Sequence, residues 1–227
     1  MMEMLLDWNK DLSKEKDING STPLHFVVSA PYKQRYILLC GFRFPDFPLE
    51  NYPTWHILDA NPSAAYEPDN NGLFPVHIAA LMDRLSAFRI IVKRCPGCIG
   101  LRDKRGRTFL RIAVQEKSLS IVRYAFQESI FASIMNAQDN DGNTALHLAC
   151  EAGEINYPCA LLWNLEVLIN LWNSKNQTPL DLAKCNTSAG FSNDRLMSKL
   201  QLAPLSLVHW LLICPNFHLI FCRARIT

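Results

Sequence analysis

Five stretches of the sequence repeat one pattern, and this repetition limits the possible folds more than any other feature of the chain. The stretches read DINGSTPLHFVV, DNNGLFPVHIAA, DKRGRTFLRIAV, DNDGNTALHLAC and NSKNQTPLDLAK. They begin at residues 17, 69, 103, 139 and 173, so the steps between them are 52, 34, 36 and 34 residues. A unit that recurs at such a step is typical of a protein built from stacked units of similar structure.

The composition of the unit indicates which kind of repeat this is. A period of roughly 33 residues with the pattern D-x-x-G-x-T-P-L-H-x-A is typical of ankyrin repeats, in which a turn precedes two antiparallel helices. One such unit cannot bury its apolar face alone, so neighbouring units must stack. The sequence therefore predicts an all-α ankyrin-repeat solenoid of about five helix-turn-helix repeats.

The same comparison predicts three parts of the chain. They are a partial N-terminal repeat over residues 1–16, an ankyrin-repeat domain over residues 17–185 and a C-terminal extension over residues 186–227. The stretch LDWNKDLSKEKDING aligns with LDANPSAAYEPDNNG, 52 residues later. Because the later copy follows the end of a helix, we expect the chain to start inside a repeat whose first helix is missing.

The long first step predicts an insertion in the first full repeat, at about residues 31–53. Its four prolines make one continuous helix unfavourable. We expect a short helix over residues 33–40 and an irregular loop after it.

The residue types of the unit fit a turn followed by a helix. Asp at the first turn position and Gly at the fourth suit a type I turn. Thr followed by Pro suits the start of a helix, and a histidine three residues after Thr matches a capping box. Arg111 and Asp181 replace that histidine in two units, which argues against a metal or catalytic role. The residues to which we assign this structural role are Asp17, Gly20, Thr22, Pro23, His25, Asp69, Gly72, His77, Asp103, Gly106, Thr108, Asp139, Gly142, Thr144, His147, Thr178 and Pro179.

Apolar residues at helical spacing predict the second helix of two units. One stripe contains Leu85, Phe88, Val92 and Cys95, and another contains Leu119, Val122 and Phe126. Such spacing places the side chains on one face, which we expect to be buried.

The pair Cys95 and Cys98 is the sharpest chemical motif in the sequence. A C-x-x-C pair can act in redox chemistry when it opens a helix, because the helix N-terminus lowers the thiol pKa. Here Cys95 is expected to close a helix, where the dipole has the opposite sign. A structural zinc site would need further ligands at suitable spacing. We therefore favour structural turn residues, with reversible oxidation as the alternative.

A cluster of basic residues at the third turn is the candidate binding site. Turns and first helices line the concave face of such arrays, where a basic turn could meet an acidic protein or anionic lipid headgroups. The alternative is a charged loop that is merely solvated. The candidate partner-binding residues are Arg102, Lys104, Arg105, Arg107, Arg111, Asn140, Asp141 and Asn143.

Composition narrows the functional class. The net charge of +2 argues against nucleic acid as the partner, and 49% apolar residues allow a real core. Eight cysteines without a secretory signal indicate a reducing, cytoplasmic setting. We find no phosphate-binding glycine loop and no hydrolase or metalloprotease motif. We therefore expect a protein that binds a protein partner, with no enzymatic activity, cofactor or metal.

The apolar stretch at residues 202–222 offers a different reading. It lacks formally charged residues and is long enough to span a membrane. Pro204, His209, Pro215, Asn216 and His218 oppose a span, since they break the helix or add polar cost. The stretch either spans or touches a membrane, or it is a poorly ordered apolar extension, or it packs on the last repeat. The first case would place the protein at the inner face of the plasma membrane.

Four stretches carry a family resemblance. LLDWNKDLSKEKDINGSTPLHF, LDANPSAAYEPDNNGLFPVHIAA, RCPGCIGLRDKRGRTFL and SIMNAQDNDGNTALHLA resemble plant ankyrin-repeat proteins of the accelerated-cell-death type. The resemblance covers roughly residues 5–185 and includes the linkers between units. It implies a cytosolic ankyrin array followed by a multi-helix membrane domain, and a role in defence and stress signalling. The Pro-Gly-Gly stretch usual in that membrane domain is absent from this sequence. Compared with that family, the chain is therefore expected to be truncated at both ends.

Overall fold

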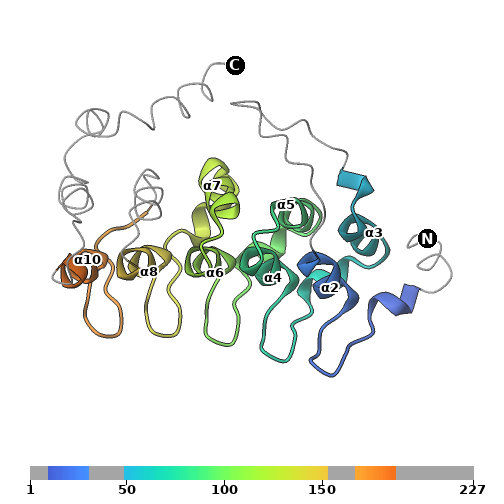
Figure 1. The fold of residues 1–227 in the computed structure, drawn as a ribbon, viewed down its shortest axis with the longest axis horizontal. Coiled ribbons are helices and arrows are strands. Elements are labelled where there is room, and N and C mark those ends of the chain that lie inside the picture. Colours follow the sequence, from blue (N-terminus) through green and yellow to red (C-terminus); the bar gives the residue numbers. More distant parts are fainter. Residues whose placement is uncertain (1–9, 31–48, 153–166, 188–227) are drawn as a thin grey trace, which may run out of the picture.

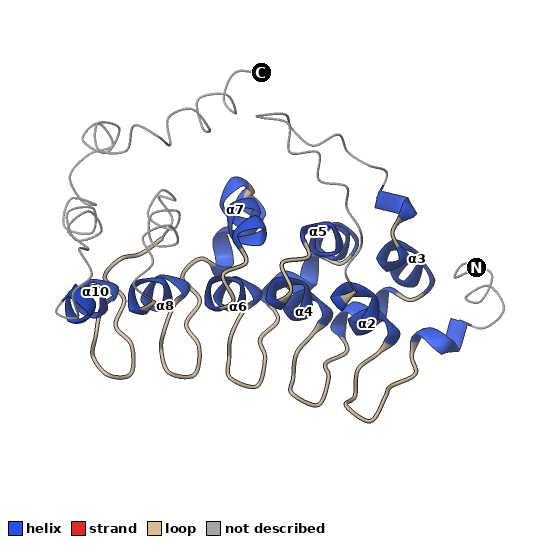
Figure 2. Cartoon of the chain, viewed as in Figure 1, coloured by secondary structure: helices blue, strands red, loops and turns tan. Residues whose placement is uncertain are grey.

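The computed structural model describes residues 10–30, 49–152 and 167–187, and these residues form helices joined by turns, with no strands (Figure 2). The expected helix at 33–40, the partial repeat before residue 10 and the stretch at 202–222 lie outside the described residues. The helices are α2 (Pro23–Ser29), α3 (Pro53–Ala60), α4 (Pro75–Leu81), α5 (Leu85–Arg94), α6 (Phe109–Gln115), α7 (Leu119–Gln127), α8 (Ala145–Glu151) and α10 (Pro179–Thr187). Short 3-10 helices are η1 (Lys10–Ser13), η2 (Leu49–Asn51), η3 (Pro62–Tyr66), η4 (Pro96–Gly100) and η5 (Ser129–Ile134).

The first helices of the five units, α2, α4, α6, α8 and α10, lie side by side in chain order (Figure 1). The turns that precede them project from one edge of this row, and α3, α5 and α7 lie on its other side. Each first helix contacts the next one. The arrangement therefore gives one edge of turns, one row of first helices and one row of second helices.

The helices begin where the sequence predicts. Pro23 and Pro179 are the first residues of α2 and α10, and Thr22, Thr108 and Thr144 occupy the N-cap positions of α2, α6 and α8. Proline fits the first helical position because its missing N–H would have no intrahelical partner there. In the first unit, η2 and the start of α3 at Pro53 replace the last part of the loop that we expected to run to residue 53.

The core lies between the two rows of helices. Phe88 of α5, Phe109 of α6 and Phe131 of η5 are fully buried, and their ring centroids lie 4.7–5.9 Å apart. Such tilted and edge-on contacts add to the free energy gained from burying the rings. Alanines at the fifth position of the first helices, Ala79, Ala113, Ala149 and Ala183, are also fully buried and allow close approach of neighbouring helices.

The predicted apolar stripes are mostly confirmed. Phe88, Val92 and Cys95 are buried along α5, and Val122 is buried in α7. Leu85 and Phe126 are only partly buried and pack against the core. Leu119 departs furthest from the prediction, since it is 38% exposed, whereas Ile121 is fully buried. Leu119 is the first residue of α7, so its side chain lies at the end of the helix, where fewer neighbours cover it.

Candidate binding surface at the turns

The first residue of each turn organises the turn from within. In the second unit, the Asp69 carboxylate accepts hydrogen bonds from the backbone N–H groups of Asn71 (2.9 Å) and Leu73 (2.7 Å). The N–H of Gly72 donates to the Asp69 carbonyl at 2.9 Å. The same bonds recur with Asp17, Asp103, Asp139 and Asn173. These polar residues therefore shape the turns, as the sequence predicts.

From the second turn onward, the second residue of each turn links it to the preceding turn. The backbone N–H of Asn70 donates to the Asn19 carbonyl at 2.8 Å, and that of Asn140 donates to the Arg105 carbonyl at 3.1 Å. The Asn140 side chain also donates to the Lys104 carbonyl at 3.1 Å, and the Lys104 ammonium donates to the Asn70 carbonyl. Two predicted binding residues, Lys104 and Asn140, thus hold neighbouring turns together.

The residues before the third and fourth turns, Arg102 and Gln138, reach in the other direction. The Arg102 guanidinium donates to the carbonyls of Gly106, in its own turn, and Gln138, in the next unit. The Gln138 amide repeats this arrangement, with bonds to Gly142 (2.7 Å) and Trp172 (2.8 Å). Arg102 is exposed, but its hydrogen bonds join one unit to the next.

Two more of the predicted residues form ion pairs. Arg107 pairs with Asp103 at 2.7 Å and donates to Gln115 at 2.9 Å. Burial alone would raise the pKa of Asp103, but hydrogen bonds and charge from Arg107 hold that pKa below its usual value. Arg111 of α6 pairs with Asp139 of the next turn at 2.6 Å, and the side chains are 11% and 3% exposed. Both arginines therefore have structural roles, whether or not a partner touches them.

Two charged residues of the predicted binding set have not yet been given a contact, and both lie at the third position of a turn. Arg105 and Asp141 are exposed, and in the described part of the chain neither side chain forms an ion pair. Lys175, at the same position of the fifth turn, has the same character, although the sequence reasoning did not select it. Alignment of the five turns by their first residue would have found it. Asn143 instead accepts a hydrogen bond from the Asn173 amide at 3.0 Å.

A groove separates the third turn from the fourth. Its volume is about 340 Å³, and it is lined by Lys104, Arg105, Arg111, Gln115, Asp139, Asn140 and Asp141. Five of these residues belong to the candidate set from the sequence. The groove is polar and open, so it fits the side chains of a protein segment better than an apolar small molecule.

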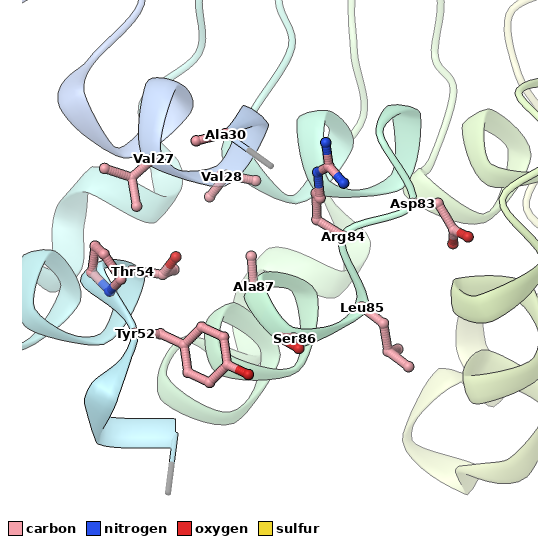
Figure 3. A pocket seen from close by; sticks show the side chains of 11 residues that line it. Val27, Val28, Ala30, Tyr52, Thr54, Asp83, Arg84, Leu85, Ser86 and Ala87 are labelled. Atoms are coloured by element: carbon pink, nitrogen blue, oxygen red, sulfur yellow. The ribbon is translucent and has the colours of Figure 1, made fainter. Parts of the chain in front are cut away.

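A second cavity lies where the ends of α2, α3 and α5 approach one another (Figure 3). Its volume is about 40 Å³. Apolar side chains such as Val28 and Ala87 line it together with Arg84, whose Nε is buried and has no hydrogen-bond partner among the described residues. A cavity of this size holds a few water molecules and is too small for an organic ligand.

The histidines act as links between units. Nδ1 of His147 accepts from the Thr144 N–H at 3.2 Å, while Nε2 lies 3.2 Å from the carbonyl of Gln177 in the next unit. His25 repeats this geometry with Thr22 and Leu73. His77 does so with Phe74 and Leu101, which confirms the expected backbone bond although Thr is missing. Burial lowers the pKa of all three imidazoles, and that of His77 to about 4.

The two cysteines of the C-x-x-C pair are buried at the end of α5. Cys95 follows the last residue of the helix, and Cys98 lies in η4. Burial raises the pKa of both thiols, that of Cys98 to about 12. Neither thiol is activated as a nucleophile, in agreement with the structural interpretation.

The described residues offer neither a metal-binding cluster nor a membrane-spanning helix. These residues contain no group of His, Cys, Asp and Glu side chains arranged to hold a metal ion. None of their helices is long and apolar enough to cross a membrane.

The chain is similar to a known protein over two thirds of its length. Human Rabankyrin-5 is 29% identical over 153 residues, which are 67% of the chain and 11% of the relative. Mouse Rabankyrin-5 is 28% identical over 154 residues, again 67% of the chain and 11% of the relative. The chain thus spans only a small part of these relatives, and no protein-family model matches it. Because Rabankyrin-5 is an ankyrin-repeat protein, this homology supports the interpretation of the chain as an ankyrin-repeat protein. It also suggests a role in protein interaction.

Proposed function

We propose that the chain is a non-catalytic protein-interaction module, an ankyrin solenoid of about five repeats that binds its partner on the side of the turns and first helices. The observation that carries this proposal is the groove between the third and fourth turns, with Arg105 and Asp141 on its walls. The groove is preorganised by bonds between the turns, and a rigid surface loses little conformational entropy on binding.

The absence of catalysis is part of the proposal and rests on the assigned roles of the reactive side chains. His25, His77 and His147 bond to the backbone of their own unit and the next. Burial keeps the two thiols of the C-x-x-C pair protonated. A protein partner, rather than nucleic acid, fits the small net charge of +2.

A photo-crosslinking residue placed in the full chain tests the binding face. Gln115 lines the groove and is exposed, whereas Arg123 is exposed on α7, a second helix. With the photoreactive residue at position 115, we expect crosslinks to a defined protein partner in cells. Position 123 should give none. Equal crosslinking at both positions, or crosslinking only at position 123, would contradict the proposed face.

A more specific setting follows from the resemblance to plant proteins of the accelerated-cell-death type. We propose a cytoplasmic module in defence and stress signalling that acts at the inner face of the plasma membrane. The apolar stretch at 202–222 favours the alternative that the chain is part of a membrane-integrated signalling protein anchored there. Alkaline carbonate extraction separates the two. Release of the chain into the supernatant would exclude the anchor, and retention that depends on residues 202–227 would support it.

A further inference from the structure

The third residues of the five turns form a row of outward side chains. They are Asn19, Asn71, Arg105, Asp141 and Lys175, and all are exposed. Their backbone is fixed, since the carbonyls of Asn19, Arg105 and Asp141 each accept an N–H from the following turn. The turns follow one another along a single edge of the molecule (Figure 1). This row therefore presents five side chains from a rigid backbone.

The last three positions of the row alternate in charge: Arg105 is positive, Asp141 is negative and Lys175 is positive. Among the described residues, none of the three side chains forms an ion pair. Two other arginines of the third unit are already paired, Arg107 with Asp103 and Arg111 with Asp139. Lys104 adds a second positive charge to the third turn, where its ammonium donates to a carbonyl of the second turn.

The spacing of the row selects one backbone conformation in a partner. Packed helices lie about 8–10 Å apart, and each turn leads directly into one of the side-by-side first helices. A polyproline II segment has three residues per turn and rises about 3.1 Å per residue, so every third side chain faces the same way at about 9 Å intervals. In a β-strand, residues three apart point to opposite faces. In an α-helix, residues three apart are separated by only about 4.5 Å along the axis, and residues seven apart, which share a face, by about 10.5 Å, just outside this range.

We infer that the turns bind a polyproline II segment of a partner protein with the charge pattern acidic-x-x-basic-x-x-acidic, the three charges facing Arg105, Asp141 and Lys175. The pattern reads the same in both chain directions, so it does not fix the orientation of the partner. This inference rests on the proposed function and adds the chemistry of the partner. A polyproline II segment is already extended before binding, which limits its loss of conformational entropy.

Synthetic peptides test the pattern on the full chain. The matching peptide is acetyl-EPPKPPE-amide, and the controls are the charge-reversed KPPEPPK and the spacing variant EPKPPPE. Binding is followed by NMR through the backbone amide shifts of Arg105, Asp141 and Lys175 at low salt. We expect the matching peptide to bind with a Kd of about 1 mM or below and about tenfold more tightly than either control, from three exposed charge pairs. Equal binding of the three peptides would overturn the inference.

Charge reversal in the protein gives a second, independent test. The triple variant Arg105→Glu, Asp141→Lys, Lys175→Glu should invert the preference, so that KPPEPPK binds about tenfold better than EPPKPPE. The side chains are exposed and form no ion pair with any described residue, so the fold should be unchanged, which circular dichroism checks. The control Arg123→Glu should keep the original preference. A triple variant that still prefers EPPKPPE would contradict the assignment of these three residues.

The outcome separates this inference from the proposed function. A partner that crosslinks at position 115, together with an absence of peptide binding, would leave the binding face in place and exclude the charge pattern. Loss of the partner crosslink would instead exclude the proposed function itself.

Discussion

Arg111 of α6 forms a 2.6 Å ion pair with Asp139, the first residue of the next turn. It stands where other first helices carry a histidine that reaches a carbonyl of the next unit, as His25 and His147 do. In the four units that another described unit follows, this position thus links the first helix to the next unit, either through a histidine or through an arginine. Where the residue is arginine, its positive charge lies against the Asp139 carboxylate, which already accepts two backbone N–H groups.

A double-mutant cycle measures this link. Asp139→Asn keeps the turn, because Asn173 shows that an amide oxygen accepts the same two N–H groups, but removes the charge. Arg111→Gln leaves a carboxylate that is almost fully buried, and we expect a loss of about 3 kcal/mol in the free energy of unfolding. The coupling between the two changes should be about 2 kcal/mol, measured by urea unfolding.

Exposed residues of the same two repeats, Arg105 and Asp141, provide the control for this cycle. Arg105→Gln and Asp141→Asn alter charges that form no ion pair within the described part of the chain, so each should change stability by less than about 0.5 kcal/mol. A coupling of similar size in both cycles would show that the link between Arg111 and Asp139 is not specific.

Gly106 cannot be replaced without strain. Its φ is +74°, and a Cβ there would lie 2.3 Å from Oδ1 and 2.9 Å from the backbone N of Asn140, which belongs to the next turn. We expect Gly106→Ala to cost about 3 kcal/mol of unfolding free energy, from the left-handed backbone and the overlap together. Gly100→Ala is the matched control, because a Cβ at Gly100 meets nothing within 4 Å. Thermal unfolding measures Tm, and an equal decrease of Tm in both variants would refute this explanation.

The last turn explains why glycine is used elsewhere. Asn176 replaces glycine at the fourth position with φ of 55°. In the described part of the chain no further turn packs on it, so only the backbone preference remains, and asparagine tolerates a left-handed φ better than most residues. The glycines of the other turns thus serve the contact between turns as much as the turn itself.

The repeat pattern predicts the helix starts, the turn residues and the bonds between each histidine and the start of its own helix. These features depend on residues close together in the sequence. Contacts between units were beyond it. The Asp83 carboxylate accepts from Ser120 (2.9 Å) and from the Ile121 N–H (3.3 Å), and so caps the start of α7 from the preceding unit. No local pattern marks such a residue.

The same limit explains the choice of binding residues. A run of positive charge at the third turn suggested a basic surface, but Arg102, Lys104 and Arg107 bond to neighbouring backbone or side-chain groups. Sequence alone gives the number of charges at a turn and not their partners. Only the positions of adjacent units show which charged side chains bond to neighbouring groups and which are left to contact a partner.

The thiols of Cys95 and Cys98 should react slowly with alkylating reagents in the native chain. Both are buried, and with a pKa of about 12 the thiol of Cys98 is almost entirely protonated at pH 8. Mass spectrometry of the tryptic peptide that follows Arg94 would measure alkylation of both residues together. We expect alkylation to be at least about tenfold slower in the native chain than in urea, since the thiolate is the reactive form. Rapid modification of the native chain would point to a reactive thiol.

As the pH falls, protonation of His77 should destabilise the fold before the carboxylates of the chain are protonated. Burial lowers the imidazole pKa from 6.5 in the unfolded chain to about 4 in the fold. The unfolded state therefore binds the proton first, so the stabilisation is complete above pH 6.5 and declines as the pH falls toward 4. His25 and His147, whose pKa values burial also lowers, add to the decline in the same direction.

At pH 5 the contribution of His77 alone should be a loss of about 2 kcal/mol relative to pH 7.5, by linkage between proton binding and folding. Urea unfolding at the two pH values measures the total loss, and NMR titration of the His77 ring protons measures the pKa directly. Most carboxylates of the unfolded chain are still ionised at pH 5, so they contribute little to the difference. A ring that titrates near 6.5 in the folded chain, or a stability that is equal at pH 5 and 7.5, would contradict the neutral link between His77 and Leu101.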